Sequence, residues 1–164
     1  MKKITSILVV MVLISFATTN ISAQGFSAGA GIAYGTNISS IGISVNGLYS
    51  LNETIQIATS FIYFLESDFV TWSVLNIDGH YKFSSNDGFD IYGIAGLGIT
   101  FASFSYDLGA WGGTISETSS NVGLNLGAGA SKKIGTNLDL FGEARYQISS
   151  GSFLTINAGV LYKF

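Results

Sequence analysis

The sequence predicts an all-β protein, an eight-stranded antiparallel up-and-down barrel that spans a membrane. Of the 164 residues, 48% are hydrophobic and only 10% are charged, whereas a soluble domain usually carries about 25% charged residues. Past the amino-terminal region no segment resembles a membrane helix, because Gly93, Gly96 and Gly98 interrupt the most apolar run, residues 91–101. Only helices and closed barrels satisfy their backbone hydrogen bonds in lipid. High apolarity without a helix therefore predicts a barrel.

Residues 1–23 have the layout of a secretory signal peptide. Lys2 and Lys3 precede an uncharged apolar stretch over residues 4–16, and small residues end the segment at Ala23. We expect cleavage after Ala23, because the apolar stretch is shorter than the roughly 20 residues that a spanning helix needs. Residues 24–164 then form a single domain, exported from the cell interior.

The composition of residues 24–164 excludes several classes of function. Cleavage removes two of the seven basic residues and none of the ten acidic ones, so the domain is acidic and has no basic patch to hold nucleic acid. The chain has no cysteine, and disulfides and thiolate metal sites are therefore excluded. We expect no cofactor and no metal ion.

Eight segments show period-two alternation and are bounded by turn residues. They cover residues 26–35, 41–50, 54–65, 71–83, 89–103, 121–131, 137–148 and 153–164. Alternate connections are short turns, at 51–53, 84–88 and 132–137, and we expect these on the periplasmic side. The remaining connections, at 36–40, 66–70, 105–120 and 149–152, then face outward, and only residues 105–120 form a long loop.

Cross-strand pairing tests whether the apolar face continues from strand to strand. We expect Tyr34 with Ile41, Ile32 with Ile43, Ala30 with Val45 and Phe26 with Tyr49 in the first hairpin; Tyr49 with Ile55, Val45 with Thr59 and Ile41 with Tyr63 in the second; and Ile148 with Leu154, Tyr146 with Ile156 and Ala144 with Ala158 in the last. In each hairpin the paired residues keep one face apolar. The facing of the fifth strand stays open, because Tyr92 and Ile94 compete with Ile91 and Leu97 for that face.

Three features favour an apolar face that turns outward to lipid over the alternative of a secreted soluble barrel or sandwich. Aromatic residues gather at the strand ends, as at a membrane interface: Phe26, Tyr49, Tyr81, Phe83, Phe89, Tyr162 and Phe164 at the turn end, and Tyr34, Phe61, Tyr63, Phe101 and Tyr146 at the loop end. The opposite face is rich in Gly, Ser, Asn and Thr, which suit a narrow interior. The third feature is the signal peptide together with an aromatic carboxyl terminus.

The chain resembles the small bacterial outer-membrane β-barrels of the OmpA transmembrane domain, OmpX and Ail type, over essentially the whole of residues 24–164. The resemblance rests on the segments Val160-Leu-Tyr-Lys-Phe164, Tyr92-Gly-Ile-Ala-Gly-Leu-Gly98 and Leu140-Phe-Gly-Glu-Ala-Arg-Tyr146. It implies residence in the outer membrane, with lipid and lipopolysaccharide as partners. It also implies that the barrel-insertion machinery reads Val160, Tyr162 and Phe164 as an insertion signal. The motifs are architectural and carry no catalytic residue, and most outer loops are shorter than those of Ail-like proteins.

Charged and amide side chains on the inward face predict a polar network in the lumen. The members are Asp78, His80, Lys82, Asp90, Asn125, Glu143, Arg145 and Asn157. If the 84–88 turn is centred on Asn86, Lys82 lies opposite Asp90 and His80 lies opposite Tyr92. Charges in so narrow a lumen must be paired or hydrogen-bonded, so we interpret the network as a structural plug. A proton or ion path is the alternative.

His80 is the single histidine, so any Ser-His-acid hydrolase site must use it. Some eight-stranded barrels modify lipid A, but His80 lies near the periplasmic turn and lipid A occupies the other leaflet. We therefore expect a protein that is not an enzyme, with no catalytic residue.

The remaining hypotheses concern the lumen and the long loop. The first is a monomeric structural barrel that contributes to envelope integrity and presents residues 105–120, where Tyr106 and Trp111 are candidate contacts for an extracellular ligand. The alternative for these aromatic residues is contact with headgroups or with the barrel mouth. The second hypothesis is a narrow porin-like channel for ions or small solutes.

Overall fold

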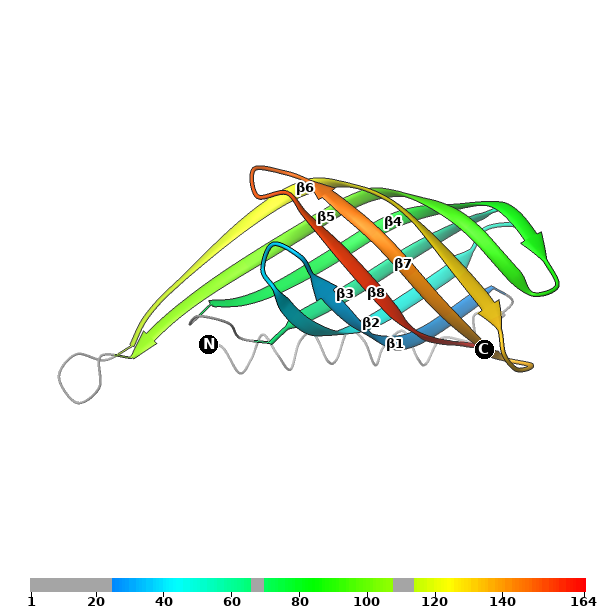
Figure 1. The fold of residues 1–164 in the computed structure, drawn as a ribbon, viewed down its shortest axis with the longest axis horizontal. Helices are drawn as coiled ribbons and strands as arrows, with labels where there is room; N and C mark the ends of the chain where they lie inside the picture. Colours follow the sequence, from blue (N-terminus) through cyan, green and yellow to red (C-terminus); the bar gives the residue numbers. More distant parts are fainter. Residues whose placement is uncertain (1–24, 66–69, 108–113) are drawn as a thin grey trace.

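The computed structural model describes residues 25–65, 70–107 and 114–164. They form a closed barrel of eight antiparallel strands in the order β1 to β8 (Figure 1). The strands are β1 (Phe26–Gly35), β2 (Ser40–Ser50), β3 (Ile55–Phe64), β4 (Val70–Asn86), β5 (Phe89–Asp107), β6 (Thr114–Lys133), β7 (Leu138–Ile148) and β8 (Phe153–Lys163). The predicted fold class is confirmed. The predicted signal peptide and its cleavage site lie outside the described residues.

In the described segments, no helix is long and apolar enough to cross a membrane. Every strand instead has a ladder partner on each side, because β1 pairs with both β2 and β8. Small residues allow β1 and β8 to approach each other closely where the barrel closes. A Cβ added to Gly159 would lie 2.2 Å from the carbonyl oxygen of Ala30. A side chain at Gly159 would therefore push β1 and β8 apart.

The first predicted hairpin is correct in register, and two others are wrong by two residues. Tyr34 pairs with Ile41 as expected. In the second hairpin Tyr49 pairs with Ile57 rather than Ile55, and Tyr63 pairs with Ile43. The cause is a longer turn, in which the Asn52 side-chain oxygen accepts hydrogen bonds from the backbone of residues 54 and 55 at 2.9 and 2.7 Å.

The last hairpin shows the same kind of correction. Tyr146 pairs with Leu154 rather than Ile156, and Ala144 pairs with Ile156 rather than Ala158. Ser149 and Ser152 close this loop, since the Ser152 hydroxyl accepts from the Ser149 amide and donates to its carbonyl. A slip of two residues leaves every side chain on its expected face. The inward and outward assignments therefore stand although the pairs do not.

The turn between β4 and β5 lies later than expected. Asp87 and Gly88 form it, with φ of 50° and 74°, values that suit a two-residue hairpin turn. A bulge at Phe83 shifts the register, so that Lys82 pairs with Tyr92 and His80 with Ile94. The expected pairs of Lys82 with Asp90 and of His80 with Tyr92 are therefore wrong as ladder partners.

The predicted long loop is mostly strand. β5 continues to Asp107 and β6 begins at Thr114, and the pairing of these two strands is continuous from Phe89 with Lys132 to Asp107 with Thr114. The β5–β6 hairpin extends well past the other strands at the loop end (Figure 1). The tip, residues 108–113 with Trp111, lies outside the described residues, as does the side chain of Tyr106.

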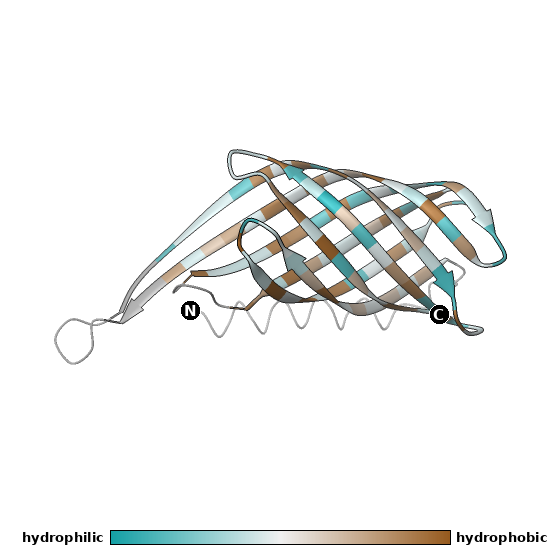
Figure 2. Cartoon of the chain, in the orientation of Figure 1, coloured by the Kyte–Doolittle hydropathy of each residue, from teal (hydrophilic) through white to brown (hydrophobic). Residues whose placement is uncertain are grey.

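The outer surface of the barrel is apolar, and hydropathy alternates along each strand (Figure 2). Of the aromatic residues expected at the strand ends, Phe101 is partly buried and the others are exposed. The open question on β5 is resolved, because Tyr92 and Ile94 are buried inside while Leu97 is exposed. The apolar face is thus the outer face.

An arginine in the middle of this outer face tests the assignment. Val45 lies at the centre of β2 and is exposed, so we expect Val45→Arg to destabilise the barrel in lipid vesicles by about 2–4 kcal/mol. The measurement is reversible urea unfolding followed by tryptophan fluorescence. Leu51→Arg, in the turn after β2, is the control and should cost at most about 1 kcal/mol. Equal costs at the two positions would contradict a lipid-facing β2.

Candidate functional site in the barrel lumen

The loop end of the lumen is filled by an apolar cluster that the sequence analysis did not identify. It consists of Ala33, Ile62, Phe64, Val74 and Phe153, with Ile38 and Trp72 packed against it. Phe64 has no exposed surface. Glycines make room for this packing, since a Cβ on Gly42 would lie 2.9 Å from the Phe64 ring. The cluster could have been predicted from the run Phe61-Ile62-Tyr63-Phe64, which is apolar on both faces of β3.

The middle of the lumen holds a cluster of three charges that joins two strands without a shared ladder, β4 and β7. Arg145 on β7 places its Nε atom 2.9 Å from Asp78 Oδ2 on β4, and its Nη2 atom 3.0 Å from Glu143 Oε2. The three side chains are at most 8% exposed. Asn125 on β6 donates to Asp78 Oδ1 at 2.9 Å. Asp78, Arg145, Glu143 and Asn125 thus lie together in one cluster.

Amides and hydroxyls continue the polar layer around this cluster. The amide of Asn157 donates to Asn46 Oδ1, and its oxygen accepts from the Ser44 hydroxyl at 2.8 Å. Asn76 extends the charge cluster toward β3, because its oxygen accepts from Asn125 while its amide donates to Ser60. Asn157 is therefore part of the polar layer, bonded to β2 rather than to Arg145.

Two glycines provide the space that these side chains occupy. A Cβ on Gly96 would lie 2.4 Å from Asp78 Oδ1, and one on Gly129 would lie 2.5 Å from the Tyr92 ring. Both distances are far shorter than a van der Waals contact. The inward glycines of β5 and β6 thus accommodate bulky neighbours.

The turn end of the lumen contains the remaining predicted residues. Lys82 Nζ lies 2.8 Å from Asp90 Oδ2, and the His80 ring stacks on Tyr92 with centroids 4.7 Å apart. Both contacts were expected, although from the wrong register. The Tyr92 hydroxyl donates to Glu143 Oε1 at 3.0 Å, and His80 Nε2 lies 3.9 Å from the same oxygen. His80, Lys82 and Asp90 thus lie within one polar region.

Sequence reasoning missed a second ion pair at this end. Lys163 on β8 contacts Asp139 on β7, with Nζ 2.5 Å from Oδ2. Asp139 is buried and Lys163 is partly exposed. Alternation along β8 places Lys163 on the same inward face as Asn157, and Asp139 lies on that face of the adjacent strand. Two inward residues of opposite charge on neighbouring strands are visible in the sequence, and they could have predicted this ion pair.

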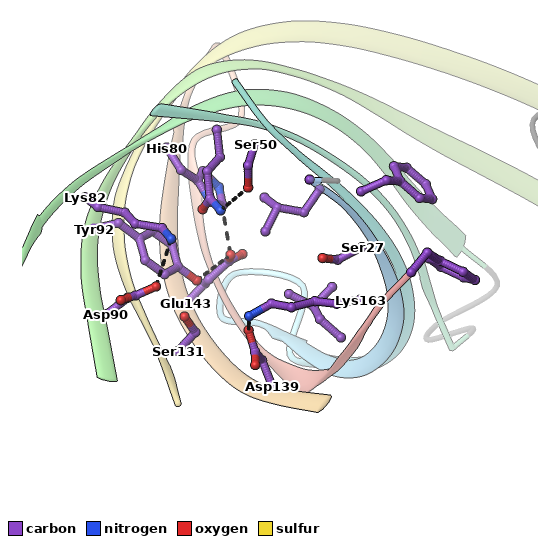
Figure 3. A pocket seen from close by; sticks show the side chains of 16 residues that line it. Ser27, Ser50, His80, Lys82, Asp90, Tyr92, Ser131, Asp139, Glu143 and Lys163 are labelled. Atoms are coloured by element: carbon purple, nitrogen blue, oxygen red, sulfur yellow. Dashed lines mark hydrogen bonds and ion pairs between the residues drawn. The ribbon is translucent and has the colours of Figure 1, made fainter. Parts of the chain in front are cut away.

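These ionisable groups enclose a cavity of about 250 Å³ at the turn end, which we call the vestibule. Figure 3 shows the ion pair of Lys82 with Asp90 and that of Lys163 with Asp139 around it. Its polar wall includes Gln56, His80, Lys82, Asp90, Asp139 and Glu143. Leu48 and Leu161 add apolar surface to the lining.

The geometry around His80 does not resemble a hydrolase site. In the described part of the chain its Nε2 atom has no hydrogen-bond partner, so no serine hydroxyl donates to it as a nucleophile would. Ser85, one of the two serines of the adjoining strand end, instead donates to Asp90 at 2.5 Å. No group of three His, Asp or Glu side chains among the described residues is arranged to hold a metal ion.

A closed barrel with an apolar outer belt and a polar interior defines an integral membrane protein of the β-barrel class. The chain belongs to the family described as outer membrane protein beta-barrel domain, which it matches over residues 10–164. The protein is therefore an integral outer-membrane protein. The comparison with curated proteins finds no match.

Several solved structures have a similar fold. The attachment invasion locus protein Ail of Yersinia pestis is 21% identical, with a TM-score of 0.60 over 85% of this chain and 97% of Ail. The N-terminal barrel of Pseudomonas aeruginosa OprF is 18% identical, with a TM-score of 0.64 over 85% and 97%. Neisserial surface protein A is 19% identical, with a TM-score of 0.63 over 85% and 96%. At these identities the likeness shows the fold.

A double-mutant cycle tests the charge cluster. Asp78→Asn leaves Arg145 buried with reduced compensation, and Arg145→Met leaves two carboxylates buried without their cation. We expect each single variant to destabilise the barrel by about 3–5 kcal/mol, and the double variant to cost clearly less than the sum. Urea unfolding in vesicles measures all four proteins. Additive costs would show that the two side chains do not interact.

Proposed function

We propose that the protein is a structural outer-membrane barrel with a closed lumen, which contributes to envelope integrity and presents the β5–β6 hairpin at the cell surface. The observation that carries the proposal is the filling of the lumen over two successive layers. The apolar cluster occupies the loop end, and the Asp78, Arg145 and Glu143 cluster occupies the middle. The outer apolar belt anchors the barrel in lipid.

The same two layers argue against the porin-like alternative. An ion that enters from the loop end must displace Phe64 and Phe153, which offer no polar groups to replace its hydration shell. It must then pass between side chains that cross from β4 to β7. The vestibule is open space, but it lies on the turn side of both layers. The lumen is thus accessible from one end.

The hairpin supports the surface-interaction part of the proposal. Pairing of β6 with β7 begins at Leu124 with Ile148, whereas pairing of β6 with β5 extends to Thr114. Between Thr114 and Gly123, β6 therefore has a ladder partner on one edge alone among the described residues. An unpaired edge without lysine, proline or a bulge is a template for an added strand.

The partner that fits this edge is an extended segment of another protein outside the cell. Two copies in one membrane direct β6 the same way, so their β6 edges do not meet as an antiparallel pair. The side chains along residues 117–122 are mostly small and polar, so backbone hydrogen bonds would supply most of the affinity. Recognition by Tyr106 and Trp111 and the insertion signal of Val160, Tyr162 and Phe164 stay predictions, as does contact with lipopolysaccharide.

Planar-bilayer recording of the purified protein tests the closed lumen. We expect no steady conductance, because the apolar cluster blocks the loop end. The double variant Phe64→Ala with Phe153→Ala is the positive control. Removing both rings should raise the frequency of brief openings, which would show that the recording detects reconstituted protein. A steady wild-type conductance that bulky substitutions at Gly96 and Gly127 abolish would establish the channel instead.

A lysine on the free edge tests the hairpin. Ser120→Lys introduces the charge that natural sheets use to block edge pairing, so we expect binding of extended peptides from an array to the nanodisc-embedded barrel to be lost. Ser103→Lys is the control, because Ser103 has ladder partners on both sides, Thr71 and Thr118. Equal loss in both variants would contradict recognition through the β6 edge.

A further inference from the structure

A basic side chain lies on the outward face of the barrel at the turn end. It is Lys132, near the end of β6, and it is exposed. Its neighbour Ser131 lines the vestibule, and successive side chains of a strand point to opposite faces of the sheet. Lys132 therefore points away from the lumen, toward the lipid.

The surroundings of Lys132 are apolar. In the two ladders of β6 it pairs with Phe89 on β5 and with Leu140 on β7, whose side chains are 43% and 46% exposed. Phe89 is one of the aromatic residues at the turn end, and such residues mark the headgroup level of a membrane. Farther into the apolar belt lies Ala130, paired with Gly142, where an added Cβ would meet no atom within 4 Å. Lys132 thus lies at headgroup level beside open apolar surface.

Lys132 has no counter-ion within the described chain. The cations inside the barrel, Lys82, Arg145 and Lys163, each contact a carboxylate, whereas Lys132 takes part in none of the ion pairs of the described residues. A charge in apolar surroundings is costly without an opposite charge. A lysine at a membrane boundary lays its apolar stem along the hydrophobic surface and brings its ammonium group to the headgroups. An anion at headgroup level would therefore complete the site.

The next residue, Lys133, has the same chemistry and a different position. Its amide donates to the Gly88 carbonyl oxygen at 2.7 Å, and a Cβ on Gly88 would lie 3.0 Å from Lys133 Cβ. Its ladder partner is Asp139, which faces inward and contacts Lys163. Lys133 thus lies against the turn between β4 and β5, on the opposite side of the strand from the lipid.

We propose that Lys132 binds the phosphate of an anionic phospholipid in the leaflet at the turn end, with an acyl chain against Leu140 and Gly142. The ammonium group donates to the phosphate oxygens. Phosphatidylglycerol suits the site better than phosphatidylethanolamine, because the latter headgroup carries its own ammonium group to balance the phosphate. The apolar surface beside Lys132 favours a lipid over a free phosphate ion. Such a contact fixes the depth of β6 in the membrane, which an apolar belt alone does less exactly.

Native mass spectrometry of the purified protein tests the proposal, with titrations of phosphatidylglycerol and phosphatidylethanolamine that have identical acyl chains. We expect the first phosphatidylglycerol to bind about fivefold more tightly, which corresponds to about 1 kcal/mol for one lysine near an anionic surface. Inorganic phosphate in large excess should not displace it. Equal affinities for the two lipids would overturn the proposal. Displacement by inorganic phosphate would also overturn it, because the site would then bind a free anion.

Matched variants locate the contact. Lys132→Gln removes the charge and should abolish the preference for phosphatidylglycerol. Lys132→Arg keeps the positive charge and should retain the preference. Lys133→Gln makes the same chemical change as Lys132→Gln on the other side of the strand, and it should also retain the preference.

Heat-dependent gel migration establishes that each variant is folded before titration. Equal losses in the Lys132→Gln and Lys133→Gln variants would show that the overall charge of the protein attracts the lipid, and would overturn the proposal. A full preference in the Lys132→Gln variant, or a loss of preference in the Lys132→Arg variant, would do the same.

Discussion

The closure of the hydrogen-bond ladder between β1 and β8 is the constraint on which the rest of this structure depends. In hydrocarbon no water is present to satisfy a free strand edge, so the sheet must meet itself. Eight strands close around a narrow interior that side chains nearly fill. The glycines at the seam, the small inward residues and the outward apolar belt all follow from this single requirement.

The narrow interior in turn determines how charge is accommodated. Arg145 extends from β7 to Asp78 on β4, and these strands are not ladder neighbours. The contact therefore crosses the lumen past β5 and β6 and joins two strands that the backbone ladder does not pair. A barrel held by ladders alone resists separation of adjacent strands, whereas a barrel with such a contact also resists flattening. The buried charges thus stiffen the cross-section of the protein.

The sequence predicted correctly which side chains face the lumen and which face outward, but it predicted the strand registers less well. The reason is physical. Alternation repeats every two residues, so a slip of two residues, as in the pairing of Tyr49 with Ile57, leaves the pattern unchanged. Only the turn decides between the alternatives, and the turn at Asn52 depends on side-chain hydrogen bonds that periodicity does not reveal. The bulge at Phe83 is a local irregularity of the same kind.

The candidate site was predicted in composition more fully than in geometry. The contact of Lys82 with Asp90 was expected from the wrong pairing, because a long lysine side chain reaches a diagonal neighbour as well as a direct one. The pair of Asp139 with Lys163 was missed because it joins β7 and β8, whose inward charges had not been compared. The apolar cluster was missed because inward positions were expected to be polar along the whole strand.

The seam between β1 and β8 also has a consequence for the newly made chain. Ser27 pairs with Lys163, so the ladder that closes the barrel is the one that joins the two ends of the folded sequence. The other seven ladders form between consecutive strands, and closure comes at the greatest sequence separation, where contacts form most slowly. Until β8 is in place, β1 and β7 are both open edges. A chain that loses its last strand thus gains two sites for aggregation at once.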